Sequence, residues 1–97
     1  MQYRYEDAFL VKKVSEEELG QIELAAIEEA QKLGITDAYY MERYVKARVY
    51  VEIAQRHIEA DGMKEKLDVY KDEMDRYYRF SQTNSPSNIA TIPVARG

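Results

Sequence analysis

Three stretches of the chain repeat apolar side chains every three to four residues, the spacing of one face of an α-helix. The middle stretch alternates steps of four and three over its whole length, which is typical of helices packed side by side. The apolar positions are Leu19, Ile22, Ala26, Ala30 and Leu33; Tyr40, Tyr44, Ala47, Val51, Ala54 and Ile58; and Met63, Leu67, Tyr70, Met74 and Tyr77. The pattern predicts an all-α fold, a small helical bundle.

Local signals mark where these helices begin and end. Ser15, followed three residues later by Glu18, forms a capping box at the start of the first helix. Gly34 suits the left-handed position after its last turn, and Thr36 is a reasonable cap for the second helix. The second helix is expected to run up to Asp61–Gly62. So short a connection forces the second and third helices into an antiparallel hairpin.

The chain is expected to divide into three segments. Residues 1–14 lack a sustained period and are predicted to be an N-terminal lead, extended or with a single turn. Residues 15–80 are predicted to be the helical bundle domain, a short helix plus a long antiparallel helical hairpin. At residue 81 the composition becomes polar, and residues 81–97 are predicted to be a polar linker and an extended C-terminal docking tail.

The composition of the chain excludes several classes of function. The chain has 97 residues and a net charge of −4, which argues against general binding to nucleic acid or anionic membranes. It has no cysteine, so disulfides, thiolate catalysis and cysteine-ligated zinc are excluded. The apolar runs are too short for a membrane span, and the N-terminal residues do not resemble a secretory signal. An intracellular protein is the expectation.

No arrangement of residues points to catalysis, a metal or a cofactor. His57 is the only histidine, and Asp61 is the only ligand type near it on its helix face, too few for a zinc site. The four glycines are isolated and form no phosphate-binding loop. Ser15 is better used as a helix cap than as a nucleophile. We therefore expect a protein that is not an enzyme and carries no cofactor.

Two sets of residues are candidates for contacts within an assembly. Glu65, Asp68, Asp72 and Asp75 form an acidic row opposite the apolar face of the third helix, and we expect a solvated face or a wall of one charge there rather than a metal site. A second apolar strip on the middle helix indicates more than one neighbour. The residues expected at an oligomer interface, where tyrosine is enriched, are Tyr39, Tyr50, Ile53 and Tyr78.

The tail holds the residues expected to bind a partner. Ile89, Ile92 and Val94 would fill pockets on a partner protein, and Pro93 restricts backbone pairing to one side. Arg96 is the only charged side chain of the tail. Two interpretations remain open at this point: a disordered terminus, or a tethered peptide that orders on its partner.

The helical region resembles the small head–tail connector (adaptor) proteins of tailed bacteriophages. The resemblance is a pattern of helix lengths and aromatic positions within residues 15–80, not a signature motif. The segments that carry it are Ser15-Glu16-Glu17-Glu18-Leu19, Ala25-Ala26-Ile27-Glu28-Glu29-Ala30, Tyr44-Val45-Lys46-Ala47-Arg48-Val49-Tyr50-Val51-Glu52-Ile53-Ala54 and Lys66-Leu67-Asp68-Val69-Tyr70-Lys71-Asp72-Glu73-Met74.

The resemblance implies a structural adaptor subunit of the virion neck, present in the host cytoplasm during assembly. Such subunits form a ring, commonly twelvefold, beneath the portal protein, extend the DNA channel and bind the next neck or tail protein. The acidic row would face the channel, with only non-specific proximity to DNA and no membrane contact. Two alternatives remain from the residues: a free helical protein-interaction adaptor, and a small nucleic-acid-associated protein that uses Lys12, Lys13, Arg43, Lys46 and Arg48.

Overall fold

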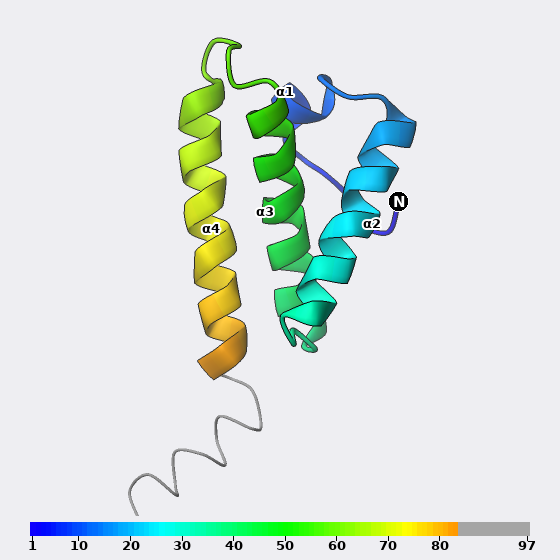
Figure 1. The fold of residues 1–97 in the computed structure, drawn as a ribbon, viewed down its shortest axis with the longest axis vertical. Coiled ribbons are helices and arrows are strands. Elements are labelled where there is room, and N and C mark those ends of the chain that lie inside the picture. The colour runs from blue at the N-terminus through cyan, green and yellow to red at the C-terminus, as the bar shows by residue number, and fades with distance from the viewer. Residues whose placement is uncertain (84–97) are drawn as a thin grey trace, which may run out of the picture.

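The computed structural model describes residues 1–83, and all regular structure in that range is helical (Figure 1). The helices are α1 (Ala8–Val11), α2 (Glu16–Lys32), α3 (Ala38–Arg56) and α4 (Met63–Thr83). The predicted all-α bundle is confirmed, and α3 and α4 lie side by side as the expected antiparallel hairpin (Figure 1). The extended tail predicted for the C-terminus lies outside the described residues.

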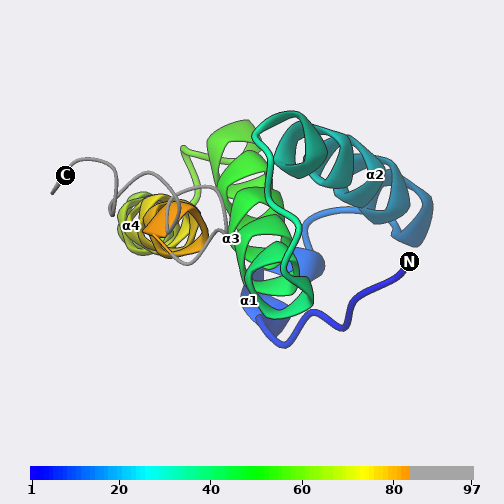
Figure 2. The same cartoon turned by 90° about the horizontal axis from the view of Figure 1, so that it is seen from below.

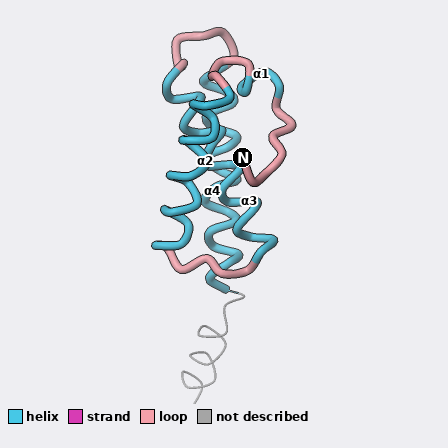
Figure 3. The backbone as a smooth tube through the Cα atoms, turned by 90° about the vertical axis from the view of Figure 1, so that its right-hand side faces the viewer, coloured by secondary structure: helices cyan, strands magenta, loops and turns pink. Residues whose placement is uncertain are grey.

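Helix α3 is the central element of the bundle. It packs against α2 on one side, against α4 on the other, and against the short α1 on a third (Figure 2). The connections between successive helices lie at the ends of the bundle (Figure 3). Because α3 has neighbours on three sides, its buried residues do not form a single stripe. They are Tyr44, Val45, Ala47, Val49, Tyr50, Val51, Ile53 and Ala54.

The predicted N-cap and C-terminal glycine of α2 are confirmed. The Ser15 Oγ accepts a hydrogen bond from the Glu18 amide at 3.0 Å, which is one of the two bonds of a capping box, while the Glu18 carboxylate accepts from Arg56 at 2.7 Å. Gly34 has a φ of 85°, a conformation that favours glycine because it has no Cβ. The amides of Gly34 and Ile35 donate to carbonyl oxygens in the last turn of α2 at 3.0 and 3.1 Å. These bonds form a Schellman motif and turn the chain into α3.

The start and end of α3 differ from the prediction. Asp37, not Thr36, is the N-cap, and its Oδ1 accepts from the amides of the first turn at 2.9 and 3.0 Å. A carboxylate is favoured there over a hydroxyl because it also places negative charge at the positive end of the helix dipole. The helix ends at Arg56, before the predicted Asp61–Gly62 boundary. Ile58 is 43% exposed, so little burial would hold a longer helix.

Helix α4 continues beyond its predicted end at Phe80 into the polar stretch. The Ser81 Oγ donates to the Tyr78 carbonyl oxygen at 2.6 Å, and the Thr83 Oγ1 donates to the Phe80 carbonyl oxygen at 3.0 Å. Each hydroxyl bonds back to a carbonyl oxygen three residues earlier, a local bond that serine and threonine make within helices. The hydroxyl residues that predicted a linker therefore lie within the last turns of the helix.

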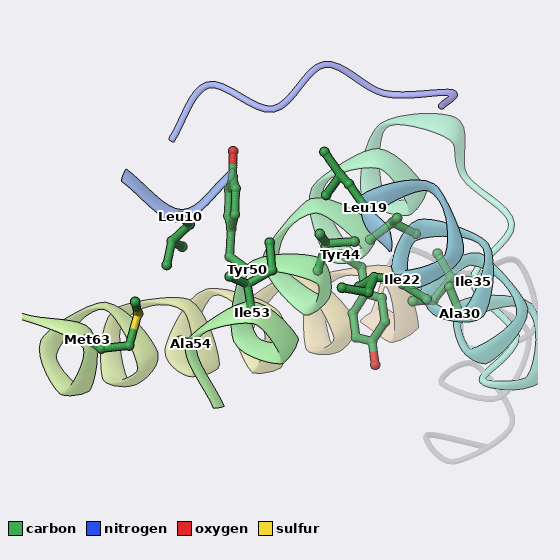
Figure 4. Close-up of a cluster of buried hydrophobic side chains, with 13 residues drawn as sticks. Leu10, Leu19, Ile22, Ala30, Ile35, Tyr44, Tyr50, Ile53, Ala54 and Met63 are labelled. Carbon is green, nitrogen blue, oxygen red and sulfur yellow. The ribbon is translucent and has the colours of Figure 1, made fainter. Parts of the chain in front are cut away.

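The core lies between α2 and α3 and reaches α1 and α4 (Figure 4). Its buried residues are Leu10, Leu19, Ile22, Ala26, Ala30, Ile35, Tyr44, Val45, Val49, Tyr50, Ile53, Ala54 and Met63. Leu10 of α1 and Met63 of α4 are both 0% exposed. Full burial of such a side chain is worth about 1.5–3 kcal/mol. Residues 1–14, predicted to be a separate lead, therefore contribute to the same core.

The prediction of Tyr50 and Ile53 at an oligomer interface is wrong. They are 5% and 0% exposed and belong to the core of the single chain. The Tyr50 ring is covered by Tyr5 and Tyr70, whose ring centroids lie 5.8 and 4.5 Å away. The second apolar strip of α3 thus faces the N-terminal segment and α4, which leaves no surface there for another copy.

Candidate interaction surface

Four aromatic rings gather where α3 begins and α4 ends, at one end of the bundle (Figure 1). We call Tyr39, Tyr40, Tyr77 and Phe80 the aromatic end. The centroid distances are 5.4 Å for Tyr39–Tyr40, 6.4 Å for Tyr39–Tyr77, 5.9 Å for Tyr77–Phe80 and 6.3 Å for Tyr40–Phe80. Each ring contacts two others, and three of the four contacts are edge-to-face, a favoured arrangement of aromatic rings.

Local structure positions these rings. The Asp37 cap holds the amides of Tyr39 and Tyr40, so both side chains start from a fixed first turn. Tyr77 and Phe80 are three residues apart and share a face of α4. That face persists because the helix extends to Thr83. Adjacent residues of a helix point in different directions, and accordingly Tyr40 packs against the core while Tyr39 projects outward.

The outer rings of the aromatic end are open to solvent. Tyr39 is 54% exposed and Phe80 is 43% exposed. Leu33, 38% exposed, ends α2 at the same end of the bundle (Figure 1). The Arg43 guanidinium lies 5.2 Å from the centroid of the Tyr39 ring, a cation–π distance. Exposed aromatic side chains next to an arginine are the composition that protein interfaces favour.

The other surface residues predicted from the sequence occupy different places. Tyr78 is half-buried against the core, and Tyr39 alone of the four predicted interface residues is largely exposed. The acidic row on α4 is solvent-exposed at every position: Glu65, Asp68, Asp72 and Asp75. Asp72 also forms an ion pair with Arg76 one turn later. The predicted partner-binding residues Ile89, Ile92, Pro93, Val94 and Arg96 lie outside the described residues.

Two of the three basic residues predicted on α3, Lys46 and Arg48, are paired with carboxylates within the chain. Lys46 Nζ lies 2.8 Å from a Glu6 carboxylate oxygen, and its side chain is only 13% exposed. Arg48 lies 3.1 Å from Glu29 and 3.2 Å from Glu52. These cations are neutralised by neighbouring carboxylates. The cluster therefore offers little free positive charge to a nucleic acid backbone.

We call residues 1–7 the N-terminal strap. Two buried carboxylates hold it, and neither was predicted from the sequence. Glu23 of α2 is 4% exposed and accepts hydrogen bonds from the strap. The Asp7 side chain is 8% exposed and contacts Lys66 and Tyr70 of α4. One signal was present: Glu23 lies four residues after Leu19, where the apolar face of α2 would place an apolar residue.

Hydrogen bonds decide the ionisation of both carboxylates. Burial by itself raises the pKa of Glu23, but hydrogen bonds from the strap outweigh it, so the pKa lies below its ordinary value. Burial likewise opposes ionisation of Asp7, and bonds from Lys66, Tyr70 and the Leu10 amide lower its pKa overall. Both groups are therefore ionised at neutral pH, as acceptors that hold structure together.

Residues 1–83 contain no group of three or more His, Asp or Glu side chains able to hold a metal ion. No helix of this part of the chain combines the length and apolar character needed to cross a bilayer. His57 caps the far end of α3 from the aromatic end. Comparison with protein-family models, with curated proteins and with solved structures gave no match for this chain. Function is therefore inferred from the exposed aromatic end.

Proposed function

We propose that the chain is a non-enzymatic structural adaptor subunit that forms a ring through its aromatic end, as in the head–tail connectors of tailed bacteriophages. The observation that carries this proposal is the aromatic end, with Tyr39 54% exposed beside Arg43. Aromatic side chains that already pack against one another lose little conformational freedom on binding. An interface built on them gains apolar burial at low entropic cost.

The geometry suits a subunit that contacts its neighbours head to tail. The aromatic end lies at one end of the bundle, while another exposed apolar residue, Val69 on α4, lies elsewhere at 54% exposure. A contact between two different surfaces of identical copies produces a closed ring when the rotation between copies closes. We assign the aromatic end to one side of that contact.

The remaining parts of the proposal follow from the resemblance to connectors. The acidic row on α4 would face the DNA channel, where negative charge keeps DNA from adhering to the wall. The C-terminal segment begins after Thr83, at the aromatic end, and would dock on the portal protein or on the next neck or tail protein. The chain would act in the virion neck and be present in the host cytoplasm during assembly.

A free helical adaptor is the second candidate, favoured by the completeness of the core. Leu10, Ile53 and Met63 are 0% exposed without any second copy, so the single chain buries its own apolar centre. Such a protein could act as a monomer that binds one partner through the same aromatic end. The nucleic-acid alternative has less support, because Lys46 and Arg48 are paired with carboxylates.

Negative-stain electron microscopy and native mass spectrometry of the purified full chain test the proposal. We expect closed rings with one dominant copy number. Removing residues 84–97 should leave the rings and the helix content unchanged, because the four helices and the aromatic end all lie within residues 1–83. A chain that stays monomeric at concentrations of about 100 μM, above the dissociation constant of ordinary specific interfaces, would support the free adaptor instead.

A further inference from the structure

The N-terminal strap is bound to α2 through a single buried carboxylate. Glu23 Oε1 accepts the Gln2 amide at 2.6 Å, and Oε2 accepts the Tyr3 amide at 2.9 Å and the Tyr5 hydroxyl at 2.8 Å. Glu23 is 4% exposed, and its three donors are two backbone amides and a hydroxyl. Three neutral donors thus converge on one charged group, and hydrogen bonds to a charged acceptor are stronger than neutral ones.

A second carboxylate holds the other end of the strap. Asp7 Oδ2 accepts Lys66 Nζ at 2.8 Å and the Tyr70 hydroxyl at 2.5 Å, which joins the strap to α4. Its Oδ1 accepts the Leu10 amide and caps α1, and its own amide donates to the Tyr50 hydroxyl at 3.1 Å. Asp7 is therefore tied to three helices, whereas residues 2–5 depend largely on Glu23.

The strap covers one side of the core. Figure 4 shows the N-terminal segment running past the Tyr50 hydroxyl. The Tyr5 ring packs edge-to-face on the Tyr50 ring with centroids 5.8 Å apart, and Tyr3 also packs against the buried cluster. With the strap in place, Tyr50 is only 5% exposed. Moving residues 1–5 away would expose the Tyr50 side of the core while Leu10, beyond Asp7, stays in place.

We propose that residues 1–5 form a lid that opens as a unit when the charge on Glu23 is lost, with Asp7 as the point where opening stops. Protonation puts a hydrogen on one of the two oxygens that already face donors. That oxygen can then no longer accept as before, and at least one strap donor is left buried without a partner, which is costly. This device is independent of ring formation.

The titratable groups that face Glu23 come mainly from the strap. They are the hydroxyls of Tyr3 and Tyr5, whose pKa values are raised, mainly by burial, and the amino group of Met1. Glu42 acts on Tyr3 from α3. Around Asp7 lie Lys66, Tyr70 and Tyr50. Because hydrogen bonds lower the pKa of Glu23, its charge is retained at neutral pH and lost only in acid, so a neutral substitute at this position isolates that charge from the other carboxyls.

Glu23→Gln tests the lid at neutral pH in the full chain, because it keeps the shape of the side chain and removes its charge. Amide exchange at Gln2 and Tyr3 should accelerate about tenfold or more, the effect of losing a buried charge-assisted bond. Trypsin should cleave after Arg4 faster by a similar factor. Circular dichroism should show unchanged helix content. The matched control is Glu28→Gln, at an exposed position of the same helix.

Three results would overturn the proposal. In the first, Glu23→Gln and Glu28→Gln show the same exchange as the unmodified chain, so Glu23 does not hold the strap. In the second, Glu23→Gln loses helix content together with strap protection, so the strap is not a separate unit. Tyr5→Phe keeps the ring and the carboxylate but removes one donor. It should give an intermediate acceleration at Gln2 and Tyr3, and full protection in this variant is the third contrary result.

Discussion

The tyrosines near the strap and core differ from those of the aromatic end in how their hydroxyls are used. The Tyr5 hydroxyl donates to Glu23, the Tyr44 hydroxyl to Glu29 and the Tyr70 hydroxyl to Asp7, while the Tyr50 hydroxyl accepts the Asp7 amide. Burial is the largest cause that raises the pKa of each of these hydroxyls. At the aromatic end, Tyr39 and Tyr77 instead make ring contacts with Tyr40 and Phe80.

The comparison shows how one residue type takes two roles in a chain with nine tyrosines. A buried ring needs a partner for its hydroxyl, and here that need is met by carboxylates and an amide that tie distant segments together. An exposed hydroxyl has no such need, because solvent can satisfy it, and the Tyr39 side chain also lies beside Arg43. We infer that hydroxyl-bonded tyrosines hold the fold and that the exposed Tyr39 side chain can contact a partner.

The largest loss of stability should come from a substitution in the core. Ile53→Ala should lower the free energy of unfolding by about 3 kcal/mol, because it leaves a cavity at a residue that is 0% exposed. Tyr39→Ala, at 54% exposure, should change it by less than about 1 kcal/mol. Urea denaturation followed by circular dichroism measures both. Equal losses for the two variants would contradict the assignment of Tyr39 to the surface.

The second prediction concerns Asp7. Asp7→Ala should lower the free energy of unfolding by about 2–3 kcal/mol, since it removes the cap of α1 and leaves Lys66 and Tyr70 without their acceptor. Asp72→Ala is the matched control, because it removes the same charge from an exposed ion pair on α4. Its effect should stay within about 0.5 kcal/mol. A loss at Asp72 as large as at Asp7 would show that net charge, not the strap contact, explains the result.

Acid should weaken the contacts that hold the N-terminal strap. The pKa values of Asp7 and Glu23 are lowered in the folded chain, so their stabilisation is present above the pKa of the unfolded chain. It is lost as the pH falls through the folded values, below about 4. The free energy of unfolding, measured in urea from pH about 6 downward, should therefore fall. Glu23→Gln should flatten that decrease, and an unchanged slope in this variant argues against Glu23 as a contributor.

The smallest expected losses of stability come from removing single tyrosine hydroxyls. Tyr44→Phe should cost about 1 kcal/mol, because the hydroxyl donates to Glu29 at 2.7 Å in a half-buried site shared with Arg48. Tyr77→Phe should leave the free energy of unfolding unchanged within about 0.5 kcal/mol, since its contacts are made by the ring. Thermal melts of the two variants side by side provide the comparison. A larger loss from Tyr77→Phe would reverse the roles assigned to the two groups.

Much of the fold followed from local rules. The Ser15 cap of α2, the glycine at residue 34 and the antiparallel hairpin depend on a few neighbouring residues and were predicted correctly. The end of α4 was misplaced because Ser81 and Thr83 act through bonds to carbonyl oxygens that composition does not reveal. Each hydroxyl residue supports either a linker or a helix end, and only the geometry distinguishes the two.

The surface was harder to predict than the helices. Tyr50 and Ile53 were assigned to an interface because the second strip of α3 had no visible partner in the sequence. Its partners are α4 and an extended strap without periodicity, and extended segments leave no pattern from which packing can be read. Tyr39, predicted at an oligomer interface, is exposed, but its grouping with Phe80 depends on the hairpin bringing two helix ends together.

The most direct test of the account is sedimentation velocity of the Tyr39→Ser/Phe80→Ser double variant against the unmodified chain. Leu24→Ser, a 61% exposed apolar residue in the middle of α2, is the matched control. We predict that the unmodified chain and Leu24→Ser sediment as the same ring, while the double variant sediments as a folded monomer. Rings of equal size in all three samples would contradict the claim that the aromatic end mediates assembly.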